Sequence, residues 1–352
     1  MKMIKIIILL LALGLLFFLY YFFILKTPKQ QTMVWGVNFS QTRAESLKLD
    51  WRETYNAILG DLGAKNIKLH TQWDWVEGEK NDYFFNDIDW QLEKAKEHGA
   101  GIIYVVGMKS GRWPECHLPD WAEQISKDDQ QKEILEYIEQ VVLRYKDNPA
   151  IVAWQAENEP LFNFGECPWY DKEFLKKEVA LIKSLDPSRP VIITDSGEQS
   201  LWLEASKIGD IVGTTMYRRV WVHLGEKLGF FYTFPMPASA YWRRAQIIEK
   251  FFNKEVINVE LQAEPWVSDV FEEVPLSVQE KTMSFSQFKK NIDYARRSGL
   301  GTTYFWGVEW WRWMQTVQDR PEYWNAAKEL LSASTVADFA PLPAQTVLKQ
   351  AN

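Results

Sequence analysis

Eight short apolar segments that alternate with amphipathic stretches predict an α/β fold of the (β/α)8 class, a TIM barrel. Polar side chains close most of these segments, as they do at the mouth of such a barrel. Glycines follow several of the amphipathic stretches, where they fit helix C-caps. The expected strands are 34–39, 66–71, 101–107, 151–154, 191–194, 211–216, 256–260 and 302–306.

The stretches between these strands have helical periodicity. The expected helices are 51–62, 88–98, 130–145, 171–185, 241–252, 279–298 and 322–331. The longest connection, 223–240, follows the sixth strand and is rich in aromatic residues, Gly and Pro. Connections of this length are usually functional lids or walls, so we expect it to border the ligand site.

The N-terminal segment predicts a membrane anchor that precedes the barrel. Residues 6–25 are twenty residues without a charge, which is enough helix to cross a bilayer. The segment ends Phe-Phe-Ile-Leu-Lys, without the small residues of a signal-peptide cleavage site. We therefore expect an uncleaved signal-anchor with the rest of the chain extracytoplasmic. Three parts follow: anchor and linker at 1–30, the barrel domain at 31–334, and a C-terminal tail at 335–352.

Composition narrows the classes of partner. The net charge is −7, and no basic run follows the membrane segment, which argues against a nucleic-acid partner. The chain has 18 tryptophans, and although most should pack in the core, exposed indoles can stack on sugar rings. Cys116 and Cys167 are too far apart, and the histidines too scattered, for a zinc site. The two cysteines follow neighbouring strands, so they are either a disulfide of an exported domain or two free thiols.

The candidate chemistry lies at two strand ends. The apolar run 150–153 leads into Asn158, Glu159 and Pro160, and because proline cannot continue a central strand, these residues begin a loop. A second buried run, 256–259, ends on Glu260. Two glutamates at two strand ends are what a glycosidase needs, one to protonate the leaving oxygen and one to attack the sugar. The alternative is that one or both are structural ion-pair partners.

The remaining strand ends add amides, carboxylates and indoles. These side chains are His70, Gln72, Trp73, Trp75, Lys109, Arg112, Trp113, His117, Asp195, Glu198, Tyr217, Arg218, Gln262, Glu264, Trp266, Trp306, Glu309, Trp310 and Trp311. A barrel mouth of this chemistry is suited to carbohydrate binding, because indoles stack on sugar rings and carboxylates accept hydrogen bonds from hydroxyl groups. An acidic mouth for another ligand is the alternative interpretation.

The arrangement resembles the retaining glycoside hydrolases of clan A, the cellulase-like superfamily that includes families 5, 39 and 42, over about residues 33–332. Residues 158–160 match the Asn-Glu-Pro motif of the fourth strand, and 254–260 match the Lys-Pro-apolar-Glu pattern of the seventh. Residues 73–89 resemble the second-loop signature, with Gly78 where proline is usual. Lys68 replaces the arginine common on the second strand, which puts a particular family in doubt more than the clan, although family 5 is the nearest in character.

The resemblance implies an O-glycosyl hydrolase (EC 3.2.1.-) of the cellulase, mannanase or β-galactosidase kind that cleaves β-linked glycans by double displacement. In such an enzyme Glu159 is the acid/base, Glu260 the nucleophile, and Asn158 holds the sugar 2-hydroxyl. Tyr217 would donate to Glu260, and Trp306 would form the floor of subsite −1. Further substrate contacts are predicted for Trp73, Trp113, His117, Glu264 and Trp266. The mechanism needs no metal and no organic cofactor.

Three alternatives stay open at this point. Glu264, four residues after Glu260, could carry the nucleophile, or it could bind a hydroxyl group or neutralise Arg218. A membrane-tethered, non-catalytic carbohydrate-binding barrel would keep the tryptophans and lose one carboxylate. A transglycosylase would use the same residues as a hydrolase. The sugar, the linkage and exo or endo action depend on loop positions that the sequence does not give.

Overall fold

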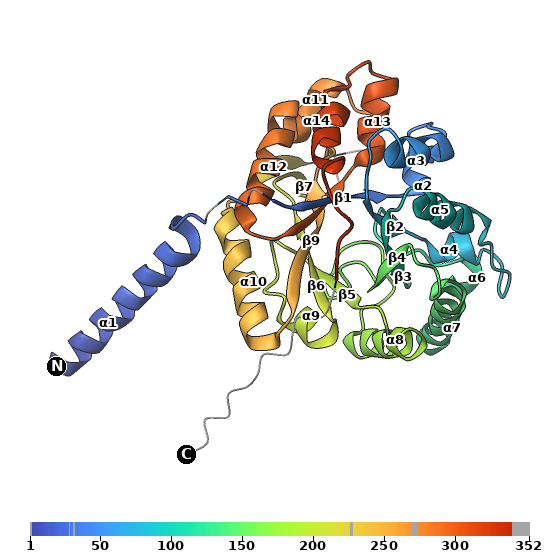
Figure 1. The fold of residues 1–352 in the computed structure, drawn as a ribbon. Helices are drawn as coiled ribbons and strands as arrows, with labels where there is room; N and C mark the ends of the chain where they lie inside the picture. The colour runs from blue at the N-terminus through green and yellow to red at the C-terminus, as the bar shows by residue number, and fades with distance from the viewer. Residues whose placement is uncertain (1, 28, 31, 226–227, 269–272, 340–352) are drawn as a thin grey trace.

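The protein forms a closed barrel of parallel strands, as predicted (Figure 1). The computed structural model describes residues 2–27, 29–30, 32–225, 228–268 and 273–339. The strands adjoin in the order β1-β10-β9-β6-β5-β4-β3-β2. Their bounds are β1 (Val34–Phe39), β2 (Asn66–His70), β3 (Gly101–Val106), β4 (Ile151–Ala156), β5 (Val191–Asp195), β6 (Ile211–Met216), β9 (Glu255–Gln262) and β10 (Thr302–Trp306). The TIM barrel expected from the sequence is therefore confirmed.

The strands are apolar along their length because both of their faces are covered. A small apolar cluster fills the inside of the barrel on the side away from the mouth. It includes Ile103, Ile192, Ile257 and Tyr304, and each of these side chains has no exposed surface. Outside, the helices pack against the opposite strand faces in a larger cluster. Strands buried on both faces read as continuous apolar runs, which is the signal that predicted them.

The helices surround the barrel, and several of them begin at a residue whose side chain caps the first turn. Asp50, Ser126, Asp171 and Ser284 each accept a hydrogen bond from a backbone N–H in the first turn of the helix that follows. The helices around the barrel are α2 (Gln41–Ser46), α3 (Trp51–Leu59), α4 (Trp73–Val76), α5 (Asn86–Glu97), α6 (Asp120–Glu123), α7 (Lys127–Tyr145), α8 (Lys172–Leu185), α9 (Leu203–Ile208), α10 (Ala238–Phe252), α11 (Leu276–Met283), α12 (Phe285–Ser298), α13 (Val308–Thr316) and α14 (Glu322–Leu331).

Three local expectations need correction. The helix expected at 279–298 is two helices, because Ser284 has an extended backbone and caps α12. The long connection after β6 contains a β-hairpin, β7 (Arg219–His223) paired antiparallel with β8 (Gly229–Thr233). Trp310 and Trp311, expected at the mouth, lie in α13 and are 1% and 0% exposed. Helical periodicity carries these two indoles into the core rather than toward a ligand.

The described part of the expected tail covers the bottom of the barrel. The Asn66 side chain donates to the carbonyl of Thr335 at 2.8 Å and accepts from the amide of Ala337 at 2.6 Å. Ala337 and Phe339 are buried against the inner cluster. Residues 335–339 therefore belong to the packed barrel, and the rest of the expected tail lies outside the described residues.

An apolar helix precedes the barrel and projects from its side (Figure 1). It consists of α1 (Lys2–Leu19) and a π-helical turn, η1 (Tyr20–Ile24). Over Met3–Ile24, 22 residues with a mean hydropathy of 2.8, it is long and apolar enough to cross a membrane. Length and composition of this kind fit either a membrane anchor or a signal sequence.

Candidate active site

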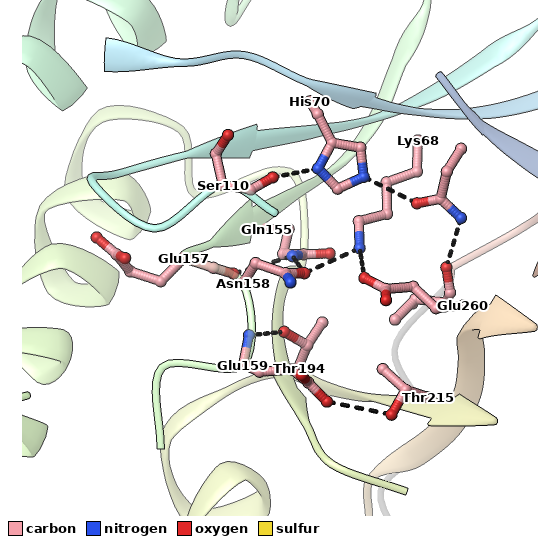
Figure 2. A network of polar contacts seen from close by, with 12 residues as sticks. Lys68, His70, Ser110, Gln155, Glu157, Asn158, Glu159, Thr194, Thr215 and Glu260 are labelled. Carbon is pink, nitrogen blue, oxygen red and sulfur yellow. Dashed lines mark hydrogen bonds and ion pairs between the residues drawn. The ribbon is translucent and has the colours of Figure 1, made fainter. Parts of the chain in front are cut away.

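The two predicted catalytic glutamates meet at the mouth of the barrel (Figure 2). Glu159 follows β4 in the turn that ends that strand, with a positive φ of 45°. Glu260 lies near the end of β9. Thr215 of β6 is the register partner of Glu260, and its Oγ1 lies 3.1 Å from Oε1 of Glu159. One threonine is therefore a direct neighbour of both carboxylates.

Two donors, one on each carboxylate oxygen, hold Glu260. The ammonium of Lys68 lies 2.9 Å from Oε1, and the hydroxyl of Tyr217 lies 2.8 Å from Oε2. Lys68 has no exposed surface and Glu260 is 2% exposed, so this ion pair is shielded from water. The contact predicted for Tyr217 is present in the structure. Lys68 reaches Glu260 as a single point contact, where an arginine would offer a two-pronged one.

Glu159 has a different environment, because the side chain that contacts its carboxylate carries a hydroxyl group rather than a positive charge. Its carboxylate oxygen faces the Thr215 hydroxyl, and its backbone N–H donates to Oγ1 of Thr194 at 2.6 Å. Burial raises the pKa of Glu159 well above its ordinary value, and the negative charges of Glu260 and Glu115 raise it further. A carboxyl group that keeps its proton near neutral pH can act as a general acid.

Asn158 connects Lys68, the ion-pair partner of Glu260, to the barrel wall. Its Oδ1 accepts from Lys68 at 3.2 Å and from Nε2 of Gln155 at 3.3 Å. Its Nδ2 points to Glu115, with Oε2 of that residue 3.5 Å away. The side chain of Glu157, by contrast, turns away from the mouth and accepts from the backbone amides of Met108 and Lys109. Only one of the two glutamates that flank Asn158 therefore faces the site.

The sequence reasoning missed a third carboxylate at the mouth, Glu115. It lies in the loop between β3 and α6, is 7% exposed, and faces Asn158. Burial and the charge of Glu260 raise its pKa to about 7, although the ammonium of Lys109 acts in the opposite direction. Cys116 and Cys167 form a disulfide that ties this loop to the one after β4. In the sequence, the local sign that this loop is held in place is Cys116, which follows Glu115 directly.

Arg112, from the same loop, covers part of the mouth. Its guanidinium lies 4.0 Å from the ring centroid of Trp306 and forms ion pairs with Glu264 and, at 3.0 Å, with Glu309. Glu264 is therefore engaged by Arg112. Arg218, the partner suggested by the sequence, instead donates to the carbonyl of Met236 and lies over the ring of Tyr294. The expected floor residue Trp306 is at the mouth, with Arg112 on its ring.

Aromatic rings form a rim beside the glutamates. Trp113 is 65% exposed, and its ring is 6.3 Å from that of Phe164. Phe164 in turn lies 5.9 Å from Trp266, and Trp266 lies 5.0 Å from Tyr217. Two of the predicted substrate residues, Trp113 and Trp266, are thus linked to Glu260 through Tyr217. Phe164 completes this rim and was not predicted.

Two other predicted substrate residues do not face the mouth. Trp73 has no exposed surface; its Nε1 donates to Glu77 at 2.8 Å and its ring stacks on Tyr137. A buried indole with its N–H satisfied is a core residue, so Trp73 offers no surface to a ligand in this structure. His117 is 4% exposed, and its Nε2 lies 3.1 Å from the carbonyl of Gly111. It supports the loop that carries Arg112.

Within the described ranges no cluster of His, Cys, Asp or Glu could hold a metal ion.

The fold and this site define a class, the TIM-barrel proteins with a pair of buried glutamates at the mouth. Residues 87–228 match the family model described as "Glycosyl hydrolases family 2, TIM barrel domain". Human β-glucuronidase is 44% identical over 57 residues, which are 16% of this chain and 8% of that protein. A probable mannan endo-1,4-β-mannosidase F of Aspergillus flavus is 37% identical over 120 residues, 31% of this chain and 25% of that one. The matched regions thus span a quarter or less of these curated relatives.

Solved structures share the fold over most of the chain. A β-galactosidase from Rahnella sp. R3 superimposes with a TM-score of 0.56 at 11% identity, covering 88% of this chain and 58% of that one. Xylanase 10B from Thermotoga maritima gives a TM-score of 0.54 at 16% identity, covering 85% and 95%. At such identities the likeness shows the fold alone. The family match adds a likeness to a glycoside hydrolase barrel domain over residues 87–228, which are less than half of the chain.

Proposed function

We propose that the protein is a retaining glycoside hydrolase that cleaves β-linked bonds in an oligo- or polysaccharide. The observation that carries this proposal is the different environment of two neighbouring glutamates. Glu260 is held by the ammonium of Lys68 and the hydroxyl of Tyr217, which suits a charged nucleophile. Glu159 is buried with a raised pKa, which suits an acid.

In the proposed reaction Glu260 attacks the anomeric carbon while Glu159 protonates the departing glycosidic oxygen. The carbon–oxygen bond to the leaving group breaks as the ester bond to Glu260 forms. Glu159, now ionised, removes a proton from water, which attacks the ester and releases the sugar with its original anomeric configuration. Lys68 stabilises Glu260 in its charged form before attack and after release.

The remaining mouth residues support roles in substrate binding. The Nδ2 group of Asn158 points into the site and can donate to the sugar 2-hydroxyl. Trp113 and Trp266 offer ring faces at the rim for sugars beyond the cleaved bond. Trp306 can form the floor of subsite −1 only on a face that Arg112 does not cover. Glu264, which Arg112 already engages, is the weaker candidate for the nucleophile.

The test is turnover of a panel of aryl β-glycosides and β-linked polysaccharides by the full-length protein in detergent. Glu159→Gln and Glu260→Gln are the matched variants, and Glu157→Gln is the control, because Glu157 turns away from the mouth. We expect cleavage that is lost in the first two variants and kept in the control. Binding without turnover in the unmodified protein would instead indicate a carbohydrate-binding barrel, and transfer to sugar acceptors would indicate a transglycosylase.

We further propose that α1 anchors the barrel to a membrane with the catalytic domain outside the cytoplasm. Its length and apolar composition support a spanning helix, and the disulfide Cys116–Cys167 supports an oxidising compartment. In this proposal residues 1–30 are the anchor and linker, and the catalytic domain begins at residue 31 and includes the packed segment 335–339. Extraction with alkaline carbonate tests it, since an anchored protein stays in the membrane pellet and a cleaved one is released.

A further inference from the structure

The end of the apolar helix is attached to the barrel by polar contacts rather than by a loose linker. The guanidinium of Arg243, in α10, donates to the carbonyl of Phe22 at 3.2 Å and to that of Leu25 at 2.7 Å. It also lies over the ring of Tyr21 at 4.3 Å. These carbonyls belong to the last turn and the C-cap of the helix, where backbone carbonyls generally lack intrahelical partners and where a cation is favoured. Arg243 therefore fixes the helix end to α10.

The residues that follow are attached to the neighbouring helix, α12. The amide of Gln30 donates to the carbonyl of Arg296 at 2.8 Å, and Lys29 forms an ion pair with Asp293. Because α10 and α12 pack against each other on the same side of the barrel, the chain from the apolar helix crosses both of them (Figure 1). If α1 spans a bilayer, α10 and α12 are the barrel elements that lie nearest to the headgroups.

The face of α10 that holds the helix end continues as an exposed apolar and basic strip. Ile247 and Phe251 follow Arg243 at intervals of four residues, so the three side chains share one face of the helix. Ile247 is 37% exposed and Phe251 is 71% exposed. The ammonium of Lys250 lies 5.8 Å from the ring of Phe251. An aromatic ring flanked by a lysine is the combination that favours the interface between water and lipid.

The adjoining surface of α12 is basic, although the whole chain carries a net charge of −7. A shallow groove on this helix is lined by Ser286, Lys289, Lys290, Asp293, Tyr294 and Arg297. Its one carboxylate, Asp293, is already paired with Lys29 and Arg297. Three cations in a groove beside the proposed anchor can bind the phosphate groups of anionic lipids.

We propose that the outward face of α10 and the basic groove of α12 form a second contact with the lipid bilayer, beside the anchor, and bind anionic headgroups. The proposal goes beyond the catalytic function and rests on α1 crossing the membrane.

This second contact would also set the direction in which the barrel mouth opens. Because α10 runs alongside the barrel strands, laying its face on the bilayer turns the barrel axis parallel to the membrane. The mouth then opens along the membrane surface rather than away from it.

The test places a probe beside the outward face of α10 without changing the residues of that face. The chain has two cysteines, both in the disulfide, so Gln246→Cys introduces a single labelling site on the flank of the α10 face. Lys132→Cys on α7, at the side chain of a residue that is 70% exposed, is the matched control. Full-length protein labelled with an iodide-quenchable fluorophore is placed in nanodiscs that hold one chain each. The discs contain phosphatidylcholine alone or with phosphatidylglycerol.

We expect iodide to quench the label at position 246 several-fold less than the label at position 132 in the anionic discs. Reversing the charges of the groove with Lys289→Glu and Lys290→Glu should remove the protection and leave turnover of soluble aryl glycosides unchanged, since both lysines lie on α12 and neither belongs to the mouth. Equal quenching at both positions in both kinds of disc would overturn the proposal. So would protection that depends on a second chain in the disc, which would assign the face to self-association. Neither result bears on catalysis.

Discussion

Two strand ends of this barrel carry the same side chain in opposite surroundings. At the end of β9, Glu260 meets an ammonium and a phenol hydroxyl, one on each oxygen. After β4, Glu159 meets the hydroxyl of Thr215, and the charges that act on it most strongly belong to other carboxylates. The comparison shows that a single site surrounds one residue type with different partners, and the proposed roles of nucleophile and acid rest on that difference. The partners of each carboxylate, rather than its identity, set its role.

The largest expected effect comes from replacing Glu260, the proposed nucleophile. Glu260→Gln should lower kcat/KM by at least about 10⁴-fold, because a neutral amide cannot form the glycosyl ester. Glu260→Gly with added azide should restore turnover, since a small anion can enter the cavity and attack in place of the carboxylate. The anomeric configuration of the glycosyl azide, read by NMR, checks the assignment: it should be inverted. A retained product would move the nucleophile elsewhere.

The second effect separates the acid from the nucleophile. Glu159→Gln should lower kcat by roughly 10²–10⁴-fold for substrates whose leaving group needs a proton. For a dinitrophenyl glycoside, whose leaving group needs none, the first step should be nearly unchanged, which a burst of dinitrophenol would show. In the unmodified protein, the proposed activity should fall as pH rises through the raised pKa of Glu159. An equal loss for both kinds of substrate would contradict the role of acid.

A third experiment tests the cation that distinguishes the two glutamates. Lys68→Met should destabilise the fold by about 3–5 kcal/mol, because it leaves Glu260 charged and unpaired in a buried place. Lys68→Met with Glu260→Gln should recover much of that loss, and Lys68→Arg, which keeps the charge, is the matched control. Urea unfolding followed by tryptophan fluorescence measures all of them. A double variant as unstable as Lys68→Met would show that the ion pair is not the cause.

The smallest effect concerns the third carboxylate. The pKa of Glu115 in the folded protein is about 7, above its ordinary value of 4.5, so the folded state binds the extra proton between these pH values. Stability from this group is complete below pH 4.5 and is lost as pH rises through 7, by up to roughly 3 kcal/mol. Glu115→Gln should remove that decline, which unfolding at pH 5 and pH 9 would reveal. It should also move the alkaline limb of kcat to lower pH, since Glu115 raises the pKa of Glu159.

Sequence predicted the barrel and the two glutamates because both signals are local. Strands buried on both faces give apolar runs, and the residues after them must lie at the barrel mouth. The contact of Tyr217 with Glu260 follows from the same rule, since both close strands that are neighbours in the barrel.

The sequence could not give the path of the loop after β3. Its course depends on a disulfide to a residue 51 positions away, which two isolated cysteines left undecided. Glu115 and Arg112 enter the mouth on this loop, so Glu115 was missed, and Arg112 rather than Arg218 forms the ion pair with Glu264. Trp73 failed for a related reason, because a strand-end position does not tell which way an indole turns.

The most direct test of the central claim is covalent trapping. The protein is incubated with a panel of 2,4-dinitrophenyl 2-deoxy-2-fluoro-β-glycosides, which form the glycosyl ester quickly and release it slowly, and is analysed by intact mass and peptide mapping. The account predicts one fluoroglycosyl group per chain, carried by Glu260, and none in Glu260→Gln. A label on Glu264, or release of dinitrophenol with no labelled protein at any time point, would contradict it.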